Sequence, residues 1–138
     1  MAQPEKIFTA EEANQVLSQV ASLVQQLQGL QTSILQTNRQ LDEGTRKLAQ
    51  GNGYPIKDIR RQLAELTQHQ LDLLQAFQSA LQQLENLGGI LKDLNQGLVD
   101  FYGLREGELV LLCWRLGEDQ VRFWHTLEEG FAGRRPLQ

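Results

Sequence analysis

The amino-acid sequence predicts an α+β fold, in which a long, coiled-coil-like antiparallel helical hairpin is followed by a small three-stranded antiparallel β-meander. Two observations lead to this prediction. Before Gly88-Gly89, apolar residues recur every three or four positions, a period typical of helices with one buried face. After these glycines, the chain changes to short apolar runs separated by glycine-containing turns, which are typical of strands.

The first helix is expected to span residues 9–50. Thr9 and Glu12 form a capping-box pair, in which each side chain accepts a hydrogen bond from the backbone amide of the other residue. The apolar repeat then continues for roughly five heptads, which favours a coiled-coil-like seam over an ordinary surface helix. Glycines tolerate positive φ and proline suits a first helical turn, so the run Gly51-Asn52-Gly53-Tyr54-Pro55 is expected to connect two helices.

The second helix is expected to span residues 55–88 and to run antiparallel to the first, because the connection between them is short. Further apolar residues widen the two seams: Leu17, Val24, Leu74 and Leu81. Either a second copy of the chain covers this stripe in a four-helix bundle, or the chain's own C-terminal sheet covers it. The sequence leaves both coverings open.

The meander is expected within residues 97–127, and residues 128–138 are expected to form an irregular tail. The three predicted strands of the meander are Leu98–Tyr102, Glu108–Arg115 and Gln120–Thr126. The middle strand is apolar on both sides, as a covered central strand should be. At this length the whole chain, residues 1–138, is expected to form a single domain.

Turn lengths predict a register for the meander. A five-residue first loop places Tyr102 opposite Glu108 and Asp100 opposite Val110. A four-residue second loop places Val110 opposite His125, and likewise Leu112 opposite Phe123 and Trp114 opposite Val121. Asp100 and His125 then share one face at roughly 10 Å, close enough to bracket a ligand but too far apart to bond directly. The same register puts Cys113 on the face opposite His125.

The composition excludes several classes of function. The formal net charge is −4 and the isoelectric point is near 5.2, which argues against nucleic-acid binding and against adhesion to anionic membranes. No run approaches the roughly 18 apolar residues of a membrane span, and no signal peptide is evident, so a cytoplasmic location is expected. Cys113 is the single cysteine, which excludes an internal disulfide and a zinc site made of cysteines.

Carboxylates and a histidine near the sheet have the ligand types needed for a divalent metal ion or for acid–base chemistry. Asp100 and His125 are the metal-ligand candidates, although their spacing matches no known metal motif. The alternative is that Asp93 and Asp100 cap turns and His125 is a hydrogen-bonded sheet histidine. The candidates for contact with a ligand or partner are Asp93, Asp100, Trp114, Glu118, Arg122, Trp124, His125 and Arg134.

One of the two tryptophans, Trp114 or Trp124, is expected to lie outside the main core, because the two alternate along neighbouring strands. Exposed beside Arg115 or Arg122, it would make a partner-contact site. No residue is assigned a catalytic role, because the sequence contains no phosphate-cradling glycine loop, no dinucleotide fingerprint and no Ser-His-Asp arrangement.

The segments LKDLNQGLVDF, LLCWRLGE and FWHTLEEGFAGR resemble the signature region of an uncharacterised bacterial family, domain of unknown function 2203 (DUF2203). The start of the first helix, Phe8–Asn14, also resembles that family, so the resemblance covers nearly the whole chain. It implies no activity, but it implies that a set of sheet and tail residues belongs to the family motif: Asp93, Gly97, Asp100, Trp114, Glu118, Trp124, His125, Gly130, Phe131 and Arg134. Such a motif is richer in polar and aromatic residues than packing requires, which favours a site on the sheet.

These observations favour a non-enzymatic protein–protein interaction or scaffold protein that forms a homodimer through its helices. The alternative is a protein that binds a small ligand or a divalent metal ion, either as a binding protein or as an enzyme, with its polar site on the C-terminal sheet. The sequence indicates no particular cofactor. Measuring the direction of the Asp100 and His125 side chains discriminates between the two hypotheses.

Overall fold

A computed structural model describes residues 6–51 and 53–138 and confirms an α+β fold with a helical hairpin. Helices α1 (Ala10–Gln50) and α2 (Ile56–Asn86) differ by one or two residues from the predicted bounds. The strands are β1 (Ile90–Asp93), β2 (Leu98–Arg105), β3 (Glu108–Arg115), β4 (Phe123–His125) and β5 (Arg135–Pro136), and a short 3-10 helix spans Phe131–Gly133. The sheet therefore has five strands, and the prediction of three is wrong.

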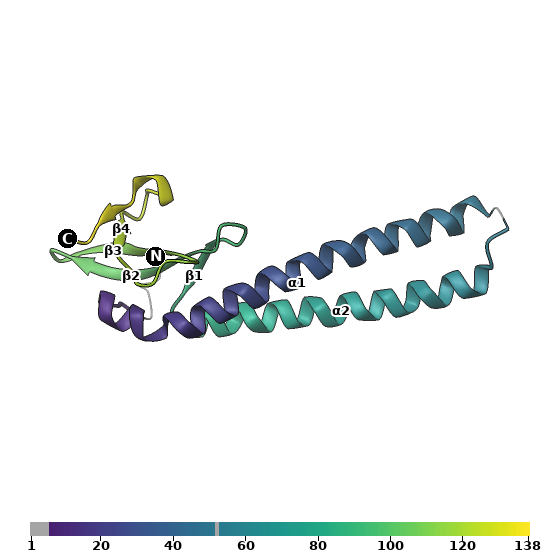
Figure 1. Cartoon of the computed structure of the whole chain (residues 1–138), viewed down its shortest axis with the longest axis horizontal. Helices are drawn as coiled ribbons and strands as arrows, with labels where there is room; N and C mark the ends of the chain where they lie inside the picture. The colour runs from purple at the N-terminus through teal and green to yellow at the C-terminus, as the bar shows by residue number, and fades with distance from the viewer. Residues whose placement is uncertain (1–5, 52) are drawn as a thin grey trace. The chain divides into compact units, whose positions relative to one another are not determined.

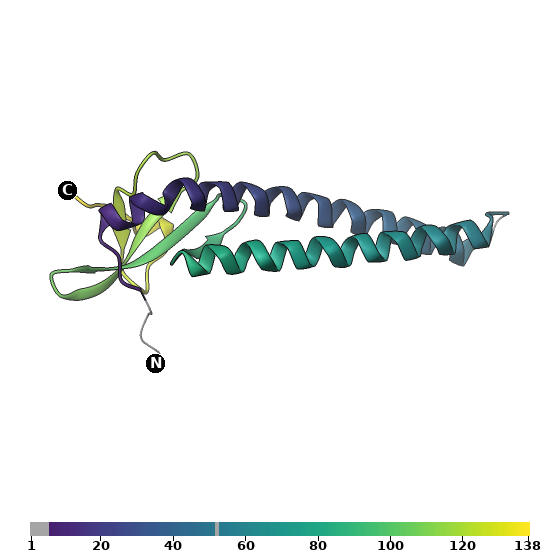
Figure 2. The same ribbon diagram turned by 90° about the horizontal axis from the view of Figure 1, so that it is seen from below.

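The chain divides into two compact units. The hairpin unit, residues 27–80, contains most of both helices, which lie side by side (Figures 1 and 2). Its core is thin, since its buried residues among those that the structure describes are Leu27, Thr37, Ile59, Gln70 and Ala80. Two of these five side chains are polar, so this unit buries little apolar surface by itself.

Gln70 lies on the buried seam of the hairpin unit. Its Nε2 atom donates to the carbonyl oxygen of Ile34 at 3.0 Å and to Oδ1 of Asn38 at 2.5 Å. Its Oε1 atom is buried and has no hydrogen-bond partner among the described residues. An acceptor buried without a partner lowers the stability of the fold, whereas the two bonds of Nε2 fix the position of α2 against α1.

Replacing Gln70 with leucine is therefore expected to raise the free energy of unfolding by about 1–2 kcal/mol, because it removes an unpaired buried oxygen and adds apolar burial. Urea denaturation monitored by circular dichroism measures this change. Gln75→Leu, on the exposed side of the same helix, is the matched control and should change stability by less than about 0.5 kcal/mol. A destabilised Gln70→Leu would show that the bonds to Ile34 and Asn38 outweigh the orphaned oxygen.

The sheet unit combines the chain up to Gln26 with Leu81–Gln138. Its strands follow chain order, β1-β2-β3-β4-β5, and every neighbouring pair is antiparallel. Within this unit the first turns of α1 lie on one face of the sheet, and the segment after β4, drawn yellow, lies on the other (Figure 1).

The face toward the helices carries the apolar core of this unit. The ring of Phe8 packs edge-on against Phe101 with centroids 5.3 Å apart, and the amide of Phe8 donates to the carbonyl of Tyr102. Leu17 and Val24 are buried within this unit, so the chain itself covers this part of the apolar stripe.

The turn between β2 and β3 is shorter than predicted. It consists of Glu106 and Gly107 alone, with φ of 54° and 81°, the pair of positive angles that a type I′ hairpin turn requires. Asp100 consequently faces Cys113 and Tyr102 faces Leu111. The predicted pairs Asp100 with Val110 and Tyr102 with Glu108 are wrong, because the assumed five-residue loop shifts the register by three positions.

Strand β4 begins at Phe123 and not at Gln120. The amide of Val121 donates to Oδ1 of Asn14 on α1 and not to β3. Because of this contact between helix and loop, the strand begins after Val121. His125 then faces Leu111, whereas the predicted partner was Val110. The predicted pairs of Leu112 with Phe123 and of Trp114 with Val121 are wrong for the same reason, as Leu112 faces Trp124 and Cys113 faces Phe123.

The two unpredicted strands lie at the edges of the sheet. Strand β1 has four residues with a register irregularity between Leu91 and Asp93, and β5 has two, one of which is proline. Segments this short show no two-residue period in the sequence, so only their position beside β2 and β4 makes them strands. The tail expected to be irregular is thus partly paired with the sheet.

Candidate functional site

A polar cluster is buried on the sheet face away from the helices. It consists of Asp100 on β2, Cys113 on β3 and His125 on β4, which are 1%, 1% and 2% exposed. One ligand atom from each side chain lies within 4.8 Å of the other two. Three neighbouring strands thus bring oxygen, sulfur and nitrogen donors to one point.

Two hydrogen bonds hold the His125 ring. Its Nδ1 atom lies 2.8 Å from the carbonyl oxygen of Thr126, which can only accept, so Nδ1 carries a proton. Its Nε2 atom lies 2.9 Å from Oδ2 of Asp100, and this second bond also needs a proton, either on the ring or on the carboxyl group. The ring is therefore fixed in direction, with Nε2 pointing at Asp100.

Burial disfavours the charged forms of the other two groups. It raises the pKa of the Asp100 carboxyl, an effect that the charge and hydrogen bond of His125 oppose. Burial raises the pKa of the Cys113 thiol to about 12, with a further contribution from Asp100 and an opposing one from Arg134. Without a bound cation, Cys113 is therefore a thiol at neutral pH.

Cys113 is expected to resist iodoacetamide in the folded protein, because the thiolate is the nucleophile and the raised pKa lowers its population by about 1000-fold. Thiol labelling followed by intact-protein mass spectrometry reports on this residue alone, since it is the single cysteine of the chain. Labelling should become fast in denaturing urea. Equally fast labelling of the folded protein would contradict the buried position of the thiol.

A cavity of about 260 Å³ opens onto the cluster, and all three of its side chains contribute to the wall. The other lining residues are Lys92, Leu98, Glu128, Glu129, Gly130 and Phe131. Glu129 is held in place, since one carboxylate oxygen accepts from the amide of Thr126 and the other pairs with Arg135 at 3.0 Å. These hydrogen bonds lower the pKa of Glu129, so it is a carboxylate at neutral pH.

Arg134 closes this face of the sheet. Its guanidinium donates to both carboxylate oxygens of Glu118, at 2.7 and 3.1 Å. It also stacks on Phe123 and Phe131, with ring centroids 4.0 and 4.3 Å away. Arg134 also interacts with the thiol of Cys113, so the Arg134–Glu118 ion pair is in direct contact with the cluster.

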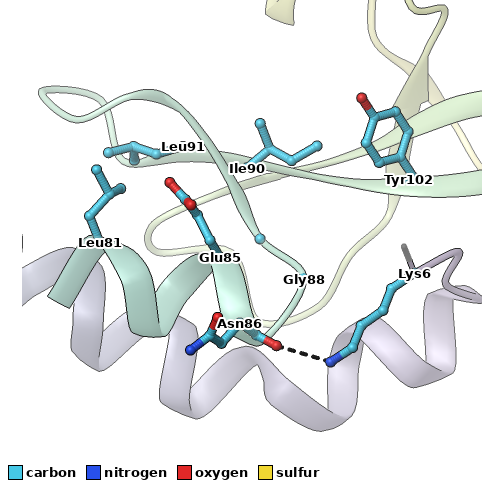
Figure 3. A pocket seen from close by; sticks show the side chains of 9 residues that line it. Lys6, Leu81, Glu85, Asn86, Gly88, Ile90, Leu91 and Tyr102 are labelled. Carbon is cyan, nitrogen blue, oxygen red and sulfur yellow. Dashed lines mark hydrogen bonds between the residues drawn. The ribbon is translucent and has the colours of Figure 1, made fainter. Parts of the chain in front are cut away.

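A larger groove of about 680 Å³ lies where α2 ends and β1 begins (Figure 3). Lys6 on its wall donates to the carbonyl oxygen of Asn86 at 2.9 Å. Among the described residues, the groove lining holds no group of three metal-ligating side chains. The smaller cavity on the sheet is therefore the better candidate for chemistry.

The remaining predicted residues lie outside the cluster. Asp93 accepts two hydrogen bonds from Gln96 and caps the turn after β1, and Asp100 caps no turn, because it lies within β2. Trp114 is buried and donates to the carbonyl oxygen of Glu118. Arg122 pairs with Asp119 on the surface.

Trp124 is half-buried and lies between two arginines. The cations over its ring are Arg105 and Arg135, at 4.9 and 5.0 Å, where the sequence suggested Arg115 and Arg122. Its Nε1 atom is buried and has no hydrogen-bond partner among the described residues.

Sequence reasoning missed Cys113 as a member of the cluster and placed its thiol on the wrong face. The expectation that Asp100 and His125 lie too far apart to bond is likewise wrong, since they are 2.9 Å apart. The sequence carried little signal for this turn, because two-residue hairpin turns favour Asn-Gly or Asp-Gly and Glu106-Gly107 supplies the glycine alone. That turn places Asp100 opposite Cys113 directly.

Fold and site together define an α+β protein whose helical hairpin precedes a five-stranded antiparallel sheet with a buried Asp–Cys–His cluster. Residues 6–137 match the uncharacterised conserved protein family DUF2203, and the chain belongs to this family. No curated protein and no solved structure matches the chain. Neither helix in the described part of the chain is long and apolar enough to span a bilayer.

Proposed function

We propose that this protein binds a divalent transition-metal ion at Asp100, Cys113 and His125, and that Zn²⁺ suits this donor set best. The observation that carries the proposal is the meeting of one carboxylate oxygen, one sulfur and one imidazole nitrogen within 4.8 Å. Zinc is of intermediate softness and accepts all three donor types.

The hydrogen bond from His125 to Thr126 supports this proposal. Metal-binding histidines usually donate their second ring N–H to a carbonyl or carboxylate, which fixes the tautomer and points the other nitrogen at the metal. Here Nδ1 donates to Thr126, and Nε2 is aimed at the other donors.

The charge balance supports a divalent ion in particular. Without metal, the cluster holds one proton between His125 and Asp100 and one on Cys113, so its net charge is zero. Replacing both protons with one dication leaves a carboxylate, a thiolate and M²⁺, which again sum to zero. The exchange therefore places no uncompensated charge in the buried site, where such a charge would be costly.

Titration of the metal-free protein with Co²⁺, a coloured substitute for zinc, tests the proposal. Thiolate coordination should give a sulfur-to-cobalt charge-transfer band, and a four-coordinate ion should give strong visible d–d bands. His125→Gln and Cys113→Ser are each expected to weaken binding by at least about 100-fold, because each removes a donor atom.

His69→Gln is the matched control, because His69 is an exposed histidine on α2, and it should bind Co²⁺ like the unaltered protein. Circular dichroism checks that each variant is folded. If the folded, unaltered protein shows no thiolate–cobalt band, and elemental analysis finds no metal after loading with Zn²⁺, the metal proposal is wrong.

We propose self-association through α1 and α2 as a second function, in keeping with a scaffold role. The thin core of the hairpin unit favours it, as do three half-exposed leucines: Leu35, Leu71 and Leu74, which are 51%, 50% and 47% exposed. A second hairpin packed on this unit would bury these side chains in a four-helix bundle.

Analytical ultracentrifugation tests this second proposal. The expected species is a dimer, and Leu71→Glu with Leu74→Glu should convert it to a monomer, because buried charges oppose association. Leu104→Glu is the control, since Leu104 is 58% exposed and lies on β2, outside the hairpin unit. An unaltered protein that stays monomeric at high micromolar concentration contradicts the proposal.

A further inference from the structure

We infer that the metal ion keeps one coordination position open to the 260 Å³ cavity, and that this position takes a small aliphatic carboxylate held in part by Lys92. This inference rests on the proposed metal binding and adds to it the class of the external ligand.

Three protein ligands leave one coordination position of the metal ion vacant. Zinc in proteins is usually four-coordinate, and sites with three protein ligands leave the fourth position to water or to a substrate. Among the described residues, no further histidine, cysteine or carboxylate joins Asp100, Cys113 and His125. All three line the same cavity, so the vacant position of a bound ion faces that cavity.

Lys92 brings a positive charge to the cavity wall. Lys92 is close enough to Asp100 to lower its pKa, and among the described residues it makes no ion pair. Once a metal ion takes the charge of Asp100, Lys92 keeps its positive charge on the cavity wall, with Glu128 as the opposing charge there. Glu129 is already paired with Arg135, so it does not neutralise Lys92.

Glu128 opposes the binding of an anion, because it is an exposed carboxylate on the same cavity wall. Lys92 balances Glu128 in number, and the metal ion with Asp100 and Cys113 is neutral, so net charge alone does not select the ligand. A carboxylate is favoured because it coordinates directly at the vacant position of the metal ion, with Lys92 on the same cavity wall.

The cavity wall is partly apolar. Leu98 and Phe131 give the cavity an apolar side, and its volume admits only a small molecule. A ligand with a carboxylate at the metal and a short aliphatic chain against Leu98 and Phe131 satisfies both surfaces. A bare inorganic anion would coordinate the metal ion but would make no contact with the apolar wall.

Titration of the Co²⁺-loaded protein with sodium propionate at constant ionic strength tests this inference. The d–d bands are expected to change saturably, because a carboxylate replaces water on the metal. Propionate should bind more tightly than chloride, and Lys92→Gln should weaken propionate binding by about fivefold, as expected for the loss of one exposed charge near the ligand.

Glu128→Gln is the matched control, since it also exchanges one charged side chain of the same cavity for glutamine. It should leave propionate binding unchanged or make it tighter. A Co²⁺ spectrum that does not respond to propionate overturns the inference while the proposed metal binding stands. Equal effects of Lys92→Gln and Glu128→Gln overturn the role of Lys92, whereas failure to bind Co²⁺ at all overturns the proposed function itself.

Discussion

Zn²⁺ is expected to bind about 100-fold more tightly for each unit by which the pH rises through the neutral range. Binding releases two protons: the one that His125 and Asp100 share, and the one on Cys113, whose pKa of about 12 keeps it protonated throughout this range. Because protons compete with the ion, lower proton concentration favours the metal-bound form. Each released proton contributes about tenfold per pH unit.

Competition against a coloured chelator at a series of pH values measures this slope. Cys113→Ser provides the internal comparison, since a serine hydroxyl coordinates weakly and keeps its proton, and its slope should fall to about tenfold per pH unit. The charged neighbours Lys92, Glu129 and Arg134 are unchanged in that variant. An affinity that does not depend on pH would show that metal binding displaces no proton from the cluster.

Replacing Arg134 with alanine is expected to lower the free energy of unfolding by about 2–4 kcal/mol. The variant leaves Glu118, whose side chain is only 23% exposed, without its bidentate partner. It also removes the cation from the faces of Phe123 and Phe131. Both losses act on the segment that covers the Asp–Cys–His cluster, so the cluster should also become accessible.

Urea denaturation measures the loss of stability, and iodoacetamide labelling of Cys113 reports on access to the cluster. Arg135→Ala is the matched control, because Arg135 forms a more exposed ion pair with Glu129 and should cost less than about 1 kcal/mol. If both variants lose the same stability, the covering segment is not held by the Arg134–Glu118 pair.

The helices could be predicted closely because their signals are local. The capping box predicted from Thr9 and Glu12 is present, with both reciprocal hydrogen bonds at 2.9 and 3.1 Å. The apolar period and the glycines after each helix fix the helix ends, so the predicted bounds differ by at most two residues. Strands β1 and β5 could not be predicted this way, because they are too short to show a two-residue period and become strands only by pairing with β2 and β4.

The candidate site was harder to predict because it depends on register. The predicted register was wrong by three positions between β2 and β3 and by one position between β3 and β4. Each odd shift moves a side chain to the other face relative to its neighbouring strand, so the two errors cancelled for Asp100 and His125, which were correctly placed on one face. They did not cancel for Cys113, which belongs to the strand between the two turns. A side chain on a central strand is therefore the one most easily assigned to the wrong face.

The edges of the sheet bear on how the protein behaves in concentrated solution. A long, straight edge strand invites another chain to add to it, and this is a common route to aggregation. Here one edge is interrupted near Lys92 and the other ends on Pro136, which has no amide hydrogen to donate. Such edges are poor templates for fibril growth, so this sheet should stay free of strand-to-strand polymerisation.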